Sequence, residues 1–138
     1  MLIEIDHHVG VPIYLQIIRQ VRQQIMTNGL KEGEQIEPVR DLAARLKVNP
    51  MTVSKAYSFL EAEGLVERRR GVGLFVARVE EKKKGIIQRQ MLGDVVARTV
   101  VTALQLRVSE DEVIELFKKH FRAHKSGVRR GKWQTAIR

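Results

Sequence analysis

The chain contains no cysteine, which excludes disulfides, thiolate metal sites and thiol nucleophiles. Long apolar runs are absent as well: none approaches the roughly 18 to 20 residues that span a bilayer. The N-terminal residues include acidic side chains, whereas a signal peptide starts with basic residues and continues into a long apolar segment. We therefore expect a soluble, cytoplasmic protein without a membrane partner.

Positive charge is what the chain has in excess. Its 138 residues carry 25 Lys and Arg against 16 Asp and Glu, a formal net charge of +9. Residues 1–79 contribute only +2 of this charge, and residues 80–138 contribute the other +7. Such an excess favours an acidic polymer such as a nucleic acid as partner, but its distribution does not locate a specific site.

The first half of the chain has the hydrophobic spacing of helices. Pro12 is suited to a helix start, and the apolar stripe that follows ends at Asn28-Gly29. Its inward residues are Tyr14, Ile17, Ile18, Val21 and Ile25. A second, shorter stripe consists of Val39, Leu42, Ala43 and Leu46.

Asn49-Pro50 predicts an N-cap followed by a first-turn proline, so a third helix begins after a short turn. Glu63-Gly64 ends it. Two helices joined by such a turn are typical of a helix-turn-helix. The inward residues of the third helix are Val53, Ala56, Tyr57 and Leu60.

Two short strands are expected next, "LVERRR" and "LFVA", joined through Gly71-Val72-Gly73, where glycine permits the positive φ that a hairpin needs. Successive strand residues point to opposite faces, so the adjacent arginines cannot all share one face, and we expect one or two of them on a nucleic acid. They are Arg68, Arg69 and Arg70. The fold class is therefore mainly α with a small β-wing, a winged helix-turn-helix domain over residues 1–78.

The second half is expected to form a short two-helix dimerisation region. The polar sequence "RVEEKKKG" predicts a linker at 79–85, and "SEDE" from Ser109 has the capping-box pattern of a helix start. Two helices cannot enclose a core by themselves, so a second copy is expected to cover residues 86–125. The remaining residues, 126–138, predict a flexible basic tail. The expected dimer contacts are Leu92, Val95, Val96, Val100, Leu104, Val113, Phe117 and Phe121.

The outer face of the third helix is the candidate reading surface for double-stranded DNA, because in a helix-turn-helix this face enters the major groove. Lys55 could reach a phosphate or a guanine edge, and Met51 a thymine methyl. Arg40, in the first turn of the second helix, could bind a phosphate. Alternatively, Arg40 forms an intrahelical ion pair and the other residues are plain surface. The outer face comprises Met51, Thr52, Ser54, Lys55 and Ser58.

Other classes of function have less support. No catalytic constellation or phosphate loop is present, so we expect no enzyme, cofactor or metal. His120 and His124 have the i, i+4 spacing of a metal pair, but packing and dipole effects near a helix C-terminus are the commoner explanation for such a pair. A non-sequence-specific nucleic-acid or protein-interaction module that uses the basic tail remains the alternative.

The segments "PIYLQIIRQVRQQI" and "VRDLAARLKVNPMTVSKAYSFLEAEGLVERRRGVGLFV" resemble the N-terminal domain of GntR-family transcriptional regulators over about residues 11–77. The short remainder is similar to the YtrA subgroup. This resemblance implies a homodimer on a palindromic operator, usually a repressor, and leaves the effector unidentified. It places DNA contacts at Arg40, Asn49, Thr52, Ser54, Lys55, Arg69, Arg70, Gly71 and Gly73.

Two departures from the subgroup bear on DNA recognition. The chain has Ile36-Glu37-Pro38 where the subgroup usually reads Leu-Pro-Ser, which removes a serine cap and adds a charge near DNA. It also has Met51 where the subgroup usually has asparagine. The operator preference can therefore differ from the subgroup's usual one.

Overall fold

A computed structural model describes residues 1–125 of the chain, and the expected tail at 126–138 lies outside them. The chain divides into two compact units, Met1–Arg89 and a second one from Gln90 onward. Within the described part of the chain, no helix is both long and apolar enough to cross a membrane. The elements are α1 (Ile13–Met26), α2 (Val39–Leu46), α3 (Pro50–Ala62), β1 (Val66–Arg69), β2 (Gly73–Val76), α4 (Glu81–Gln105) and α5 (Glu110–Lys125).

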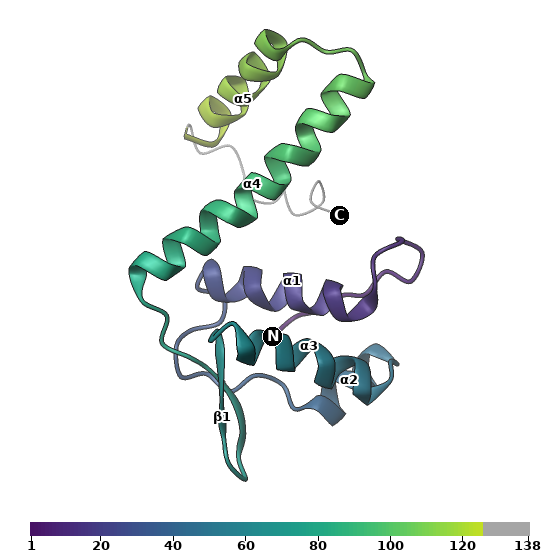
Figure 1. Ribbon diagram of the computed structural model, residues 1–138, viewed down its shortest axis with the longest axis vertical. Coiled ribbons are helices and arrows are strands. Elements are labelled where there is room, and N and C mark those ends of the chain that lie inside the picture. Colours follow the sequence, from purple (N-terminus) through teal and green to yellow (C-terminus); the bar gives the residue numbers. More distant parts are fainter. Residues whose placement is uncertain (126–138) are drawn as a thin grey trace. The chain divides into compact units, whose positions relative to one another are not determined.

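The core of the first unit lies between α1, α2 and α3, because α3 packs against both other helices (Figure 1). The inner face of α3 is buried as its spacing predicts, at Val53, Ala56, Tyr57 and Leu60. On α1 the spacing correctly predicts the buried residues Ile17, Ile18, Val21 and Ile25. Tyr14, expected on the same stripe, is instead only half-buried.

The β-hairpin extends away from these helices (Figure 1), with β1 and β2 paired antiparallel so that Arg69 lies opposite Gly73. Residues 33–36 bond to the other edge of β2. The Val76 N–H donates to the Glu34 carbonyl at 2.8 Å, and the Ile36 N–H donates to the Leu74 carbonyl at 2.9 Å. The base of the wing is therefore held along both edges of β2.

The wing turn requires glycine at Gly73. Its φ is +141°, and a Cβ there would lie 2.7 Å from the Gln35 amide nitrogen. That amide already donates to the Val72 carbonyl at 3.1 Å. Gly71 also has a positive φ, +76°, so the expected use of glycine in this turn is confirmed.

An N-terminal segment that the sequence did not reveal lies along α1. The Gln16 side-chain amide accepts from the Asp6 N–H and donates to the Asp6 carbonyl and to the Val11 carbonyl. The Gln20 amide accepts from the Glu4 N–H and donates to the Glu4 carbonyl. Gln24 donates to the Leu2 carbonyl at 2.6 Å. We call residues 2–6 with these three glutamines the N-terminal clasp.

The clasp works because two periodicities nearly agree. Two residues of extended chain advance about 6.6 Å, and four residues of helix advance about 6.0 Å. Glutamines spaced by four on α1 can therefore reach every second residue of the segment. Between these bonded positions, the side chain of Ile3 is 2% exposed and joins the core.

The segment 79–85, expected to be a linker, differs from that expectation because α4 begins at Glu81. Side chains of α4 form hydrogen bonds to the C-terminal ends of α3 and α1. Lys83 Nζ donates to the Glu63 carbonyl at 2.6 Å, and Gln88 Nε2 donates to the Met26 carbonyl at 3.1 Å. Lysine favours helix about as strongly as leucine, so this polar run is an exposed helix start.

The second unit consists of the rest of α4 and, after a turn in which Arg107 has φ +57°, of α5. The predicted capping box is confirmed: the Glu112 N–H donates to Ser109 Oγ at 3.2 Å, and Glu112 Oε2 accepts from the Ser109 N–H at 3.4 Å. Neither α4 nor α5 has a buried residue as the structure describes them. Leu92 is 63% exposed and Leu104 72%.

We predict that Gln20→Ala lowers the free energy of unfolding by about 1 kcal/mol, because the substitution removes both amide bonds to Glu4. Urea denaturation measures this. Gln23→Ala is the matched control, since the side chain of Gln23 on the same helix is exposed. Equal effects of the two substitutions would show that the clasp does not stabilise the fold.

Candidate nucleic-acid interface

The outer face of α3 begins at a well-formed cap. Asn49 Oδ1 accepts from the Met51 N–H at 2.8 Å, and Pro50 occupies the first helical position. The cap fixes where the helix starts and which way its first turn faces. A shallow depression of about 470 Å³ on this face is lined by Met51, Thr52, Ser54, Lys55 and Ser58.

The structure thus brings together the residues that the sequence placed on this face. Met51 is 75% exposed, and Ser54 and Lys55 are exposed as well, whereas Thr52 is half-buried. Ser58 Oγ donates back to the Ser54 carbonyl at 2.9 Å, so its hydroxyl is turned toward its own helix. The groups left facing solvent are a thioether, hydroxyls and an ammonium, which together suit base edges and phosphates.

Lys55 has a neighbour that sequence reasoning missed. Its Nζ lies 4.0 Å from the centroid of the Tyr14 ring on α1. Tyr14 also stacks on Phe59 of α3, with ring centroids 5.9 Å apart and an angle of 22° between the planes. The spacing of Lys55 and Phe59 by four residues puts them on one side of α3, but nothing in the sequence joins Tyr14 to them.

Arg40 is exposed in the first turn of α2, and it forms no salt bridge with any described residue. The alternative interpretation of Arg40, an intrahelical ion pair, is therefore not what the described part of the chain shows. Pro38 precedes α2 as its N-cap and supplies no side-chain hydrogen bond. The loss of the serine cap expected from the sequence is thus seen in the structure.

Glu37, which the sequence suggested as an added charge near DNA, is paired within the domain. Arg45 Nη2 donates to Glu37 Oε2 at 2.7 Å and Arg45 Nε donates to Oε1 at 3.1 Å. This hydrogen-bonded pairing lowers the pKa of the Glu37 carboxyl. The Glu37 carbonyl accepts from the Tyr57 hydroxyl at 2.7 Å, and burial raises the pKa of that hydroxyl.

The wing arginines separate as strand alternation predicts. Arg68 Nε lies 3.3 Å from Glu61 Oε2 on α3. Arg69 lies over the Phe75 ring, with its guanidinium carbon 4.0 Å from the ring centroid. Its Nη2 also lies 3.6 Å from Glu67 Oε1. Arg70 is exposed and has no salt bridge within residues 1–125.

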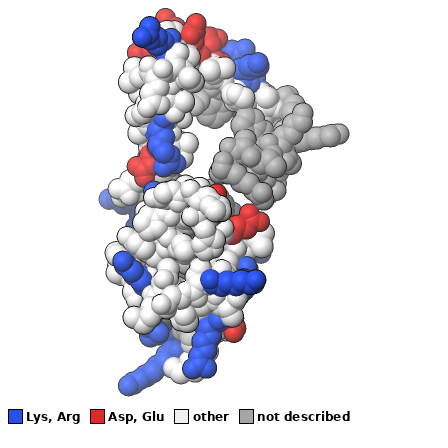
Figure 2. Space-filling model, turned by 90° about the vertical axis from the view of Figure 1, so that its right-hand side faces the viewer, with Lys and Arg blue, Asp and Glu red and all other residues white. Residues whose placement is uncertain are grey.

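The surface of the first unit presents Lys and Arg side chains that project around the end of the wing, as Figure 2 shows. Arg68 and Arg69 are partly neutralised by carboxylates of the same unit. Asn49 and Gly73 have structural reasons for their identity, the helix cap and the crowded turn. Arg70 is therefore the wing residue with the most freedom to meet an outside anion.

The predicted dimerisation residues form an uncovered apolar surface on the second unit. All of them are exposed except Val113, which is half-buried. His124 Nδ1 lies 3.0 Å from the His120 carbonyl, so that ring faces its own helix backbone. Within residues 1–125 no group of three or more His, Asp or Glu side chains is placed to hold a metal ion.

A capped helix with a polar, cationic outer face beside an arginine-bearing hairpin defines a winged helix-turn-helix protein. Residues 13–76 match the family model described as bacterial regulatory proteins, gntR family. The HTH-type transcriptional repressor YtrA of Bacillus subtilis is 39% identical over 90 residues, 65% of this chain and 68% of that protein. The chain belongs to the GntR family.

Two solved structures extend the similarity beyond the wing. A GntR family transcriptional regulator from Listeria monocytogenes is 25% identical with a TM-score of 0.70, and the match covers 83% of this chain and 98% of that one. YtrA from Sulfolobus acidocaldarius, a GntR-family transcription factor, is 32% identical with a TM-score of 0.56, covering 73% and 99%. The expected fold class and the resemblance to YtrA-type members are confirmed. The protein is a DNA-binding transcriptional regulator and not an enzyme.

Proposed function

We propose that this regulator is a cytoplasmic repressor that binds a palindromic operator in double-stranded DNA as a homodimer. The observation that carries the proposal is the exposed polar face at the capped start of α3. The name of the Bacillus subtilis relative, a transcriptional repressor, supports the direction of regulation.

In this proposal α3 lies in the major groove with its N-terminal turns toward the bases. Lys55 and Thr52 contact base edges, and Ser54 and Met51 complete the surface that follows the groove. Arg40, one helix away, binds the phosphate backbone and fixes the position of α3 without reading sequence. The exposure of Arg40 and its lack of a salt bridge within residues 1–125 support this role.

The wing adds a second point of attachment. β2 is bonded along both edges, so the turn that carries Arg70 has a fixed position relative to α3. A cation held in register with the recognition helix can select particular phosphates or a minor-groove edge. Of the three adjacent arginines, we assign this contact first to Arg70.

The second unit supplies the dimer contact. A helix pair whose apolar residues are uncovered lacks the core that a stable unit needs. A second copy would cover the same stripe on both chains around a two-fold axis, and a two-fold protein matches a palindromic site. The helical stripe centres on Val96, and Val100 follows it by four residues.

Lys55→Ala and Thr52→Ala are expected to change the preference at individual operator positions, with about 1 to 3 kcal/mol at stake for each base edge that is no longer bound. Selection of bound sequences from a random DNA pool measures the profile. Arg40→Ala is the control and should weaken all sequences alike. If both α3 variants select the same sequences as the parent protein, Lys55 and Thr52 do not contact bases in the major groove.

Arg70→Ala should weaken operator binding more than Arg68→Ala, because Arg68 is already paired with Glu61. The log–log dependence of affinity on salt should fall by about 0.9 for each phosphate that is no longer neutralised. Titrations at several salt concentrations compare the two variants. A larger decrease in affinity for Arg68→Ala would mean that its ion pair opens and that Arg68, rather than Arg70, binds the DNA.

Val96→Asp should convert a dimer into a monomer at micromolar concentration, because it buries a carboxylate in the proposed apolar contact. Sedimentation equilibrium of the full chain measures the mass. Gln105→Asp is the control: at about 100° per residue, position 105 lies on the side of α4 opposite Val96. A monomeric parent chain would exclude the homodimer.

A further inference from the structure

We propose that Tyr14 of α1 is a positioning residue for Lys55, and that it sharpens the base preference of α3 by holding the lysine ammonium over its ring. This inference rests on the proposed reading of bases by Lys55. Tyr14 lies outside the helix-turn-helix and is none of the residues that the family resemblance places on DNA.

The geometry supplies a fixed platform. Lys55 Nζ lies 4.0 Å from the Tyr14 ring centroid, well within the roughly 6 Å over which a cation is attracted to a ring face. Tyr14 is half-buried on α1, which is anchored in the core by Ile17, Ile18 and Val21. The packing of the core therefore fixes the position of the Tyr14 ring, whereas Lys55 lies on the exposed face of α3.

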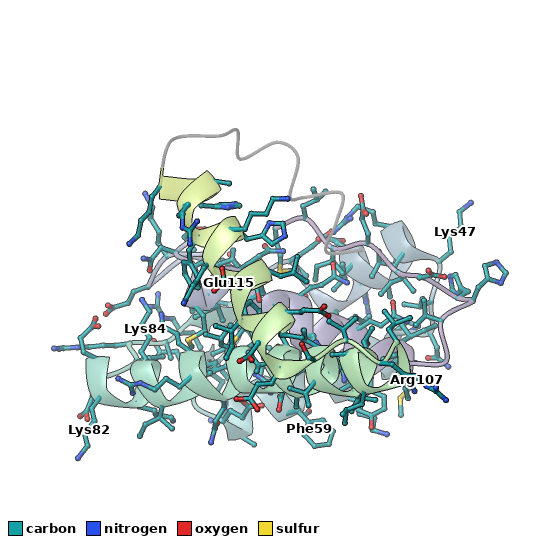
Figure 3. The ribbon with its side chains drawn as sticks, turned by 90° about the horizontal axis from the view of Figure 1, so that it is seen from above. Lys47, Phe59, Lys82, Lys84, Arg107 and Glu115 are labelled. Carbon is teal, nitrogen blue, oxygen red and sulfur yellow. The ribbon has the colours of Figure 1, made fainter. Side chains whose placement is uncertain are left out.

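Phe59 completes the platform. It stacks on Tyr14 with centroids 5.9 Å apart, and it lies four residues after Lys55 on α3. Figure 3 shows the Phe59 ring at the outer edge of the view. With 48% of its surface exposed, Phe59 adds little to the core. Its stacking instead helps to keep the Tyr14 ring in the orientation that faces Lys55.

A restrained lysine reads bases better than a free one. The lysine side chain has many rotamers, and a contact with DNA must select among them at an entropic cost. The ring faces one side of the ammonium, which leaves N–H donors on the other side for guanine O6 and N7. Holding Lys55 in advance lowers the ordering cost for one base pair and leaves competing base pairs without that gain.

The ring rather than the hydroxyl carries this role, because the contacts of Tyr14 with Lys55 and Phe59 within residues 1–125 are both made by its ring. Tyr14→Phe keeps the ring and is the matched control for Tyr14→Leu. An exposed cation–π contact of this kind corresponds to about a 2- to 5-fold change in an equilibrium constant.

The test compares full-length variants by selection of bound sequences and by titration of the selected operator. Tyr14→Leu should lower the preference about 2- to 5-fold at the base pair whose preference Lys55→Ala changes, and at no other. Tyr14→Phe should match the parent. In the Lys55→Ala background, Tyr14→Leu should have no further effect on the profile.

A second measurement and a second variant guard against a folding defect. In the free protein, the ring current of Tyr14 should shift the Lys55 ε-methylene protons upfield, and Tyr14→Leu should remove that shift. Phe59→Leu, at an exposed position, should lower the same base preference in the same direction.

The possible failures are distinguishable. If Lys55→Ala leaves the profile unchanged, the groove reading by Lys55 is wrong and this inference fails with it. If Lys55→Ala alters the profile but Tyr14→Leu and Phe59→Leu do not, only the role of Tyr14 is wrong. If Tyr14→Leu lowers the base preference equally in the parent protein and in the Lys55→Ala variant, Tyr14 contacts the DNA itself. That result would also overturn the proposal.

Discussion

The first unit depends on one constraint: α3 must bury one face completely while its opposite face stays in solvent. Tyr57 shows how the constraint is met. Its ring is buried between the helices, and its hydroxyl donates to the Glu37 carbonyl just before α2. Rotation of α3 would expose this side chain and break that bond. The packing of the buried side of α3 therefore determines the direction of its outer face, and no contact with the DNA groove is needed for this.

The features that could be predicted from the sequence are those whose cause is local. The Asn49 cap, the glycines of the wing turn and the Ser109–Glu112 box each depend on residues close together in the chain, and each is confirmed. The inner face of α3 follows from spacing alone. Local rules identified these elements because backbone geometry leaves few alternatives at such positions.

The features that could not be predicted depend on contacts between distant residues. The glutamines of the N-terminal clasp look like ordinary polar positions of a helix until residues 2–6 are laid beside them. The polar run at 79–85 resembles a linker because the partners of its side chains, Glu63 and Asn28, lie far away in the sequence. Likewise, three adjacent arginines look equivalent until Glu61 and Phe75 distinguish two of them.

The chemistry of the N-terminal clasp has a consequence for how the protein responds to its surroundings. Its bonds join neutral amides to backbone groups, so neither ionic strength nor physiological changes of pH weaken them. Contacts between arginine and phosphate, by contrast, weaken steeply as salt rises. The clasp and the binding of DNA thus respond to different variables, and a rise in salt that weakens the contacts with phosphate leaves the clasp in place.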